Sequence, residues 1–223
     1  MRMLEQSYSN VLLRLVERET RDPFRLVLSE LSRWGFLLES DPRLPSVTGL
    51  ITGERLRGSW WSHPLAHTIF RVNGLLEDHK DVLMTKLISG KITLVHRKFW
   101  PDLFAVGTAR QPWQMKGLST SARALLRLVD QKQSLSTDRL SWRHSKKPGD
   151  AARELEKKLL IHAERFHTNF GAHAKLLETW DHWAARAKFK APAVPPEMSK
   201  KRLQTKLSQL NEQHGAAAKL PWM

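Results

Sequence analysis

The sequence predicts a mainly α-helical protein with small β wings, an α+β fold built from one winged helix-turn-helix unit or from two in tandem. Three observations support this fold class. Apolar side chains recur at helical spacing along most of the chain. A tight turn at Ser89-Gly90 separates two β-prone segments, and a turn at 169–171 separates two more. Residues 117–185 carry signals for three helices followed by a hairpin, the order of elements in a winged helix-turn-helix.

Residues 1–110 are predicted to form an N-terminal α/β half. Residues 4–19 carry apolar side chains at helical spacing, which predicts a first helix. Asp22 is then a suitable N-cap and Pro23 is favourable at the first helical position, so a second helix should continue to about Trp34.

A β-hairpin is the most distinctive feature of this half. Prolines and glycines over 42–58 predict a loop with one short helical turn, and a further helix is expected over 63–76. The segments VLMTKLI and KITLV within 82–95 then predict a two-stranded ribbon, which would make this half a winged-helix unit as well. A short helix over 99–106 and a linker over 107–116 follow.

The second unit, over 117–185, has the sharper pattern. Ser119 is a suitable cap for its first helix, and Ser136 can cap a short second helix that contains Leu140. After a third helix, a hairpin over 160–177 would form the wing.

The third helix of this unit is expected to begin at Asp150 and to be the recognition helix. Leu155 and Leu159 lie on one face and would hold it to the core, which turns Arg153 and Lys157 outward. In a helix-turn-helix this outward face lies in the major groove of DNA.

Residues 186–223 are predicted to be a basic, proline-containing tail. Eight basic residues face two acidic ones in this segment, and Pro192, Pro195 and Pro196 indicate a linker before a weak helix over 199–213. We expect the part from Ala191 onward to be dispensable for folding and to act as a tether that adds affinity for the partner.

The charge balance of the chain indicates what kind of partner it binds. The chain has 37 Lys and Arg against 22 Asp and Glu, a net charge of +15, and its pI is about 10.5. Such a surplus favours a polyanion, and we expect nucleic acid, above all double-stranded DNA. An RNA- or ribosome-binding factor is the alternative from the interaction class.

Composition and motifs exclude several other classes of protein and of functional site. There is no cysteine, which excludes disulfides and thiolate chemistry, and no phosphate-binding loop or zinc-protease signature is present. His63 and His67 have the spacing of a ligand pair but lack an evident third ligand, so we predict neither metal nor cofactor. The chain has no signal-peptide pattern and no apolar run long enough to span a membrane, which predicts a cytoplasmic protein, nucleoid-associated in a bacterium. The oligomeric state is left open.

The candidate nucleic-acid-binding residues lie in and around the second unit, where basic side chains outnumber acidic ones. A solvated amphipathic helix, with Glu154 and Lys158 as an i,i+4 pair, is the alternative for the third helix. The candidates are Arg139, Arg143, Lys146, Lys147, Arg153, Lys157, Lys158, Arg165, His167, His173 and Lys175.

Two adjacent tryptophans, Trp60 and Trp61, are candidates for base stacking. Neighbouring side chains of a strand point to opposite faces, so the two cannot both enter the core from a strand, and an exposed ring could stack on an unpaired base. The alternative is burial of both between layers. If the protein were an enzyme, Glu54, close to this pair in sequence, would be the candidate water activator.

Two stretches resemble the winged-helix proteins grouped around the AlkZ and YcaQ DNA glycosylases. The first contains WGFLLESDPRLPSVTGLITG, GSWWSHP and KLISGKITLVHRKFWPDLFAVG, and the second is GLSTSARALLRLVDQKQSLSTDRL. The resemblance implies stacked winged-helix units that cradle duplex DNA and, in active members, base excision that tolerates bulky alkylated lesions.

The glycosylases of that group use a triplet of Gln, an apolar residue, and Gln or Asp. The comparable triplet here is Gln131-Lys132-Gln133, which has Lys at its centre and lies between two predicted helices. No catalytic residue is therefore carried over. A DNA glycosylase or nuclease acting on damaged DNA is the alternative function from the enzyme class.

Overall fold

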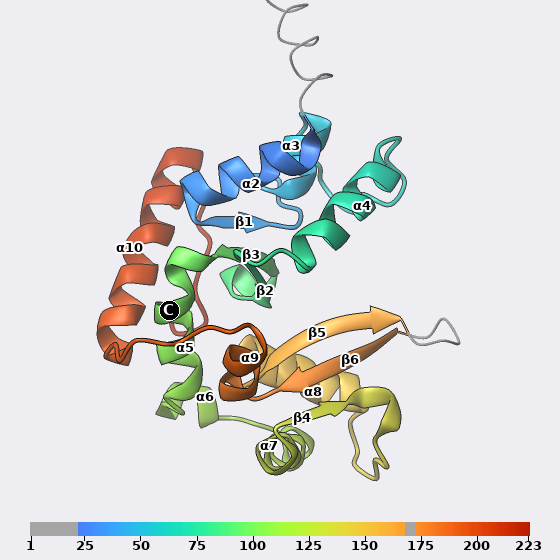
Figure 1. Ribbon diagram of the computed structural model, residues 1–223, viewed down its shortest axis with the longest axis vertical. Helices are drawn as coiled ribbons and strands as arrows, with labels where there is room; N and C mark the ends of the chain where they lie inside the picture. Colours follow the sequence, from blue (N-terminus) through green and yellow to red (C-terminus); the bar gives the residue numbers. More distant parts are fainter. Residues whose placement is uncertain (1–21, 168–172) are drawn as a thin grey trace, which may run out of the picture.

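The computed structural model describes residues 22–167 and 173–223 (Figure 1). Helices and two small antiparallel sheets make up the chain, which confirms the predicted α+β class. The helix predicted over 4–19 lies outside the described residues.

The first half contains helices on a three-stranded sheet. Its elements are α2 (Pro23–Trp34), β1 (Phe36–Leu38), α3 (Val47–Thr52), α4 (Ala66–Glu77), β2 (Val82–Lys86), the 3-10 turn η1 (Ile88–Gly90) and β3 (Ile92–His96). The strands are antiparallel in the order β1-β3-β2, so the predicted hairpin forms the centre and one edge of the sheet.

Local chemistry explains the start and end of α2. The Asp22 carboxylate accepts a hydrogen bond from the backbone N–H of Phe24, and Pro23 occupies the first turn, as the sequence predicted. Gly35 ends the helix in the left-handed region with φ of 80°, and a Cβ there would lie 2.3 Å from the Phe99 ring. This sharp turn sends the chain directly into β1, a strand that was not predicted.

The second half repeats the order helix, strand, helix, helix, strand, strand. Its elements are α7 (Thr120–Lys132), β4 (Ser134–Ser136), the 3-10 turn η3 (Thr137–Arg139), α8 (Pro148–Lys157), β5 (His162–His167) and β6 (His173–Glu178). The sheet order β4-β6-β5 is that of the first half, with the first strand of the unit paired to the last.

The prediction of a second helix in this unit is wrong. The segment from Ser134 to Ser136 is strand β4, which pairs with β6 so that Leu135 lies opposite Leu177, and only one 3-10 turn follows. Leu140, expected inside the helix, has extended backbone angles. Pairing with a strand far along the chain has overridden the local capping signal.

A third set of helices joins the halves: the 3-10 turn η2 (Arg97–Phe99), α5 (Trp100–Thr108), α6 (Pro112–Met115), α9 (Trp180–Arg186) and α10 (Pro196–His214). Part of the predicted linker over 107–116 is therefore helical. Gly107 permits close packing, because a Cβ there would lie 2.4 Å from Nε1 of Trp180 in α9. Figure 1 shows α10 running alongside α5 at the edge of the molecule.

The expectation that the tail is dispensable for folding is wrong. Leu203, Leu207 and Leu210 of α10 are fully buried in a core that also contains Phe36 of the first half and Trp180 of α9. Their spacing of four and three residues gives α10 one apolar stripe, which the many lysines around it obscure in the composition.

Two further cores lie inside the halves. One contains Val27, Val72 and Leu94 of the first half, and the other contains Leu125 and Leu155 of the second. The burial predicted for Leu155 and Leu125 is confirmed. Each half therefore has its own core, and a shared core made from both halves and α10 holds them together.

Candidate nucleic-acid interface and central cleft

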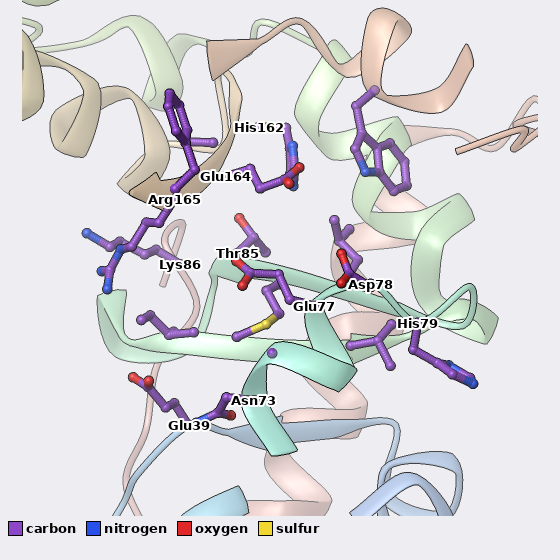
Figure 2. A pocket seen from close by; sticks show the side chains of 18 of the residues that line it. Glu39, Asn73, Glu77, Asp78, His79, Thr85, Lys86, His162, Glu164 and Arg165 are labelled. Atoms are coloured by element: carbon purple, nitrogen blue, oxygen red, sulfur yellow. The ribbon is translucent and has the colours of Figure 1, made fainter. Parts of the chain in front are cut away.

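A cleft of about 820 Å³ lies between the two halves, which we call the central cleft. Residues of α4 and β2 line one side, and residues of β5 and α9 line the other. Figure 1 shows α4 and β5 facing each other across this region, and Figure 2 shows side chains from both sides pointing into it.

Aromatic side chains form one part of the wall. Trp60 is buried, whereas Trp61 is 64% exposed, and the two rings stack with centroids 4.2 Å apart. Phe70 of α4 lies next to Trp61, with ring centroids 6.0 Å apart, and is 53% exposed. One ring of the pair is therefore exposed, and the interpretation in which both are buried is wrong. The pair lies in a turn and not in a strand, so the alternation of strand side chains does not account for this exposure.

Carboxylates make up much of the polar wall. Glu39, Glu77, Asp78 and Glu164 all line the cleft (Figure 2). Burial raises the pKa of Glu39, although Arg165 opposes the shift, and burial with the nearby Glu164 and Asp78 raises that of Glu77. Glu39 and Glu164 are distant from Glu77 and Asp78 in sequence, so only the fold brings this group together.

Glu54, the carboxylate proposed from its proximity to the tryptophans in sequence, lies elsewhere. It follows Gly53, which ends α3 in the left-handed region, and its residue is exposed outside the cleft. Nearness in sequence therefore does not bring Glu54 to the cleft that the tryptophans line.

Basic side chains enter the cleft from both halves. Lys86 comes from the end of β2 and Arg165 from β5, and Figure 2 shows them side by side. Nζ of Lys86 lies 3.4 Å from Oε2 of Glu156 in α8. The same oxygen accepts a hydrogen bond of 2.5 Å from Nζ of Lys175 in β6. This arrangement ties the two halves together at the base of the cleft.

A second network of hydrogen bonds forms around a buried carboxylate. Glu178 at the end of β6 accepts two hydrogen bonds from Arg186, of 3.0 and 2.7 Å, and its oxygens lie 3.3 Å from Nδ1 of His162 and 2.8 Å from Nδ1 of His182. Burial raises the pKa of Glu178, but the combined effect of His162, Arg186 and His182 is larger and lowers it to about 2. This network fixes the position of His162, which lines the cleft.

The predicted nucleic-acid-binding residues divide into two groups. The first is exposed, and we call it the basic face: Arg139, Arg143, Lys146, Lys147, Arg153 and Lys157. Arg153 and Lys157 lie outside the core of the second half, as expected, but the aliphatic part of Lys157 lies beside Gly90 of the first half. Lys146 pairs with Glu154 at 3.0 Å, and Arg153 pairs with Asp150 at 3.1 Å.

The other candidates have different surroundings. Nζ of Lys158 donates a 2.9 Å hydrogen bond to the backbone oxygen of Trp113, so it joins α8 to α6, and Lys175 is held by Glu156. Arg165 is exposed at the cleft. His167 and His173 are opposite each other at the end of the β5–β6 hairpin, and their side chains lie outside the described part of the chain.

Histidines at 63 and 67 do not form part of a larger cluster of ligands. Nδ1 of His63 accepts a 3.0 Å hydrogen bond from the backbone N–H of Leu65, a local turn interaction. Within residues 22–167 and 173–223, no group of three or more His, Asp or Glu side chains has an arrangement that could hold a metal ion. None of the helices in those ranges is long and apolar enough to cross a bilayer.

Comparison with known proteins adds one finding. No curated protein and no solved structure matches the chain. A family model described as AlkZ related matches residues 26–220, which include both halves, their connecting helices and α10. The matched range is much longer than the two stretches that resemble the AlkZ and YcaQ group. The chain belongs to the AlkZ-related family.

Proposed function

We propose that the protein binds duplex DNA through the basic face of its second half, as part of a role in DNA repair. Membership of the AlkZ-related family links the chain to DNA repair and to a DNA partner. The observation that carries the finer proposal is the separation of charge in the second half, where basic side chains face solvent while several carboxylates are bound internally.

Three carboxylates illustrate this separation. Glu154 accepts hydrogen bonds from the backbone N–H and the hydroxyl of Ser119, the N-cap of α7, at 2.7 and 2.8 Å. Glu156 is buried between Lys86 and Lys175, and Glu178 is fully buried. Glu156 and Glu178 are directed inward, and the six cations of the basic face exceed their two ion-pair partners, Asp150 and Glu154. The field outside this face is therefore positive, which attracts the phosphates of DNA.

The repeated order of elements supports a tandem of winged-helix units, which we propose for residues up to 110 and for 117–185. In this arrangement α8 is the third helix of its unit, the position of a recognition helix. Arg153 and Lys157 would enter the major groove, and the β5–β6 hairpin would follow the backbone as a wing. The 3-10 turn η3 would take the place of the second helix.

The central cleft has a different proposed role. Its carboxylates offset the charges of Lys86 and Arg165, so we expect the DNA backbone on the basic face, where cations are in excess. An unpaired or extruded base could stack on the exposed ring of Trp61, an interaction of about 1–3 kcal/mol per base. The raised pKa of Glu77 beside these aromatic rings favours base excision as the second candidate function, with Glu77 as an acid-base group.

Fluorescence anisotropy with a labelled duplex tests the main proposal. If 5–8 phosphates are neutralised, the slope of log K against log salt should be about −4 to −7. A slope near zero would exclude nucleic acid as the partner. Tighter binding to structured RNA of equal length would move the function to the RNA-binding class.

A further inference from the structure

Lys86 is a largely buried lysine in a strongly basic protein. Its side chain is only 11% exposed, yet it lines the central cleft. It shares a single carboxylate oxygen of Glu156 with Lys175, so two amines compete for one negative charge. The guanidinium of Arg165 is close by on the neighbouring strand (Figure 2).

This environment makes the amine easier to deprotonate than that of an ordinary lysine. Burial lowers the pKa of Lys86, Glu156 opposes the shift, and the positive charges of Lys175 and Arg165 lower it further. A lysine that is desolvated or next to another cation becomes a nucleophile near neutral pH, since only the neutral amine has a free electron pair. Amines of this kind react with carbonyl groups.

The surroundings of Lys86 restrict which carbonyl compound would enter. Trp61 and residues of β5 line the cleft together with Lys86, and its volume of about 820 Å³ admits one sugar residue with room to spare. Glu77 and Glu164 point into the same space, so an anionic aldehyde such as a free sugar phosphate would be repelled. A nucleotide without its base, extruded from a duplex held on the basic face, carries an aldehyde and leaves its phosphates outside.

We infer that Lys86 forms a Schiff base with the ring-opened deoxyribose of an abasic site in DNA. This inference rests on the proposed function, because the basic face must deliver the strand to the cleft.

The reaction needs no further reactant. The electron pair on Nζ attacks C1′ of the aldehyde and the C–N bond forms. The carbonyl oxygen then leaves as water, taking one proton from the amine and one from a protonated carboxyl group of the cleft, which gives an iminium ion. Loss of a proton from C2′ to a carboxylate of the cleft then allows the C3′–O bond to break. The 3′ phosphate departs with the electron pair, which cuts the strand by β-elimination.

Borohydride trapping tests this assignment with the full-length protein. The substrate is a labelled duplex with one abasic site, prepared by enzymatic removal of uracil. Sodium borohydride reduces the iminium to a stable amine, so a covalent protein–DNA band should appear on a denaturing gel. Peptide mass analysis should locate the adduct at Lys86.

Two variants sharpen the test. Lys86→Arg keeps the positive charge and the pair with Glu156 but cannot form the imine, and its trapped band should fall at least tenfold. Lys91→Arg is the matched control, because Lys91 follows on the same hairpin and pairs with Asp41 at 2.7 Å, outside the cleft. Its trapped band should equal that of the parent. Melting temperatures close to the parent value would show that both variants fold.

The outcomes separate this inference from the proposed function. Absence of a trapped band with the parent protein, an undiminished band with Lys86→Arg, or an adduct at another amine would each overturn the assignment. Duplex binding by the same proteins, measured by anisotropy with an undamaged strand, reports on the basic face alone. A protein that binds duplex but gives no adduct would retain the proposed function and lose the Schiff base.

Discussion

The helices α4 and α8 have the same place in the two repeats, and their exposed faces differ. The exposed side of α4 carries Phe70 and, toward the cleft, Glu77, whereas α8 exposes Arg153 and Lys157. Both helices use their other side for packing, through Ile69 and its neighbours in α4 and through Leu155 and its neighbours in α8. One topology therefore supports an aromatic, acidic surface in one half and a basic surface in the other.

The difference teaches how the two halves divide their roles. Buried positions must preserve the shape of the fold, because a change in volume there costs stability. Exposed positions carry no such constraint, so each half is free to present a different chemistry. In our proposal the second half holds the backbone of DNA, and the first half supplies the aromatic wall for a base or sugar.

The largest expected effect comes from removing α10, which would show whether the halves are independent. Deleting residues 196–223 removes three fully buried leucines, each worth about 2–5 kcal/mol as a cavity. We expect loss of the cooperative thermal transition or a large fall in its midpoint, measured by circular dichroism. Substituting exposed Lys201 by Ala is the control and should leave the midpoint unchanged. An unchanged melting curve after the deletion would mean that the halves fold without the shared core.

Removing the charges of α8 should affect binding but not folding. Changing Arg153 and Lys157 together to Ala should weaken duplex binding by about 2–4 kcal/mol, because two contacts to DNA are lost. Leu155→Ala should instead cost about 2–5 kcal/mol of stability through a core cavity. Arg71→Ala, an exposed cation on α4, is the matched control. If Arg71→Ala weakened duplex binding as much as the double variant, α8 could not be assigned as the DNA-binding helix in preference to α4.

The Glu178 network should make the second half sensitive to acid. The pKa of Glu178 is about 2 in the folded protein against 4.5 for the ordinary side chain. Because the folded value is the lower one, its contribution of about 3 kcal/mol is present above pH 4.5 and is lost as the pH falls toward 2. Denaturant unfolding at a series of pH values should show this loss in the parent and not in Glu178→Gln.

An exposed carboxylate provides the comparison for that experiment. Glu212→Gln in α10 should follow the parent at every pH, since this residue is solvent-exposed. If Glu178→Gln also follows the parent down to pH 2, the network contributes nothing to stability and only positions His162.

The smallest expected effect concerns the aromatic wall. Trp61→Ala should weaken binding to a duplex with one unpaired base by about 1–3 kcal/mol, the worth of one stacked base. Binding to a fully paired duplex should not change, because the basic face is intact. Competition anisotropy with the two duplexes measures the difference, and equal losses on both would assign Trp61 to general binding instead of base stacking.

Local sequence patterns predicted the parts of the fold that depend on near neighbours. The cap at Asp22, the hairpin around Ser89-Gly90 and the core positions of Leu125 and Leu155 are all as expected. Strands β1 and β4 were missed because three residues are too few to show a period of two. Each strand exists only because a partner far along the chain completes its hydrogen bonds.

The sequence by itself determined the surplus of positive charge and the outward direction of Arg153 and Lys157, since composition and helical period require no knowledge of distant contacts. Only the tertiary structure decided which side chains line the cleft. Glu77, Lys86 and Arg165 meet there because the core shared by both halves and α10 sets the halves face to face. Apolar burial holds that core together, and it acts between side chains whatever their separation in sequence.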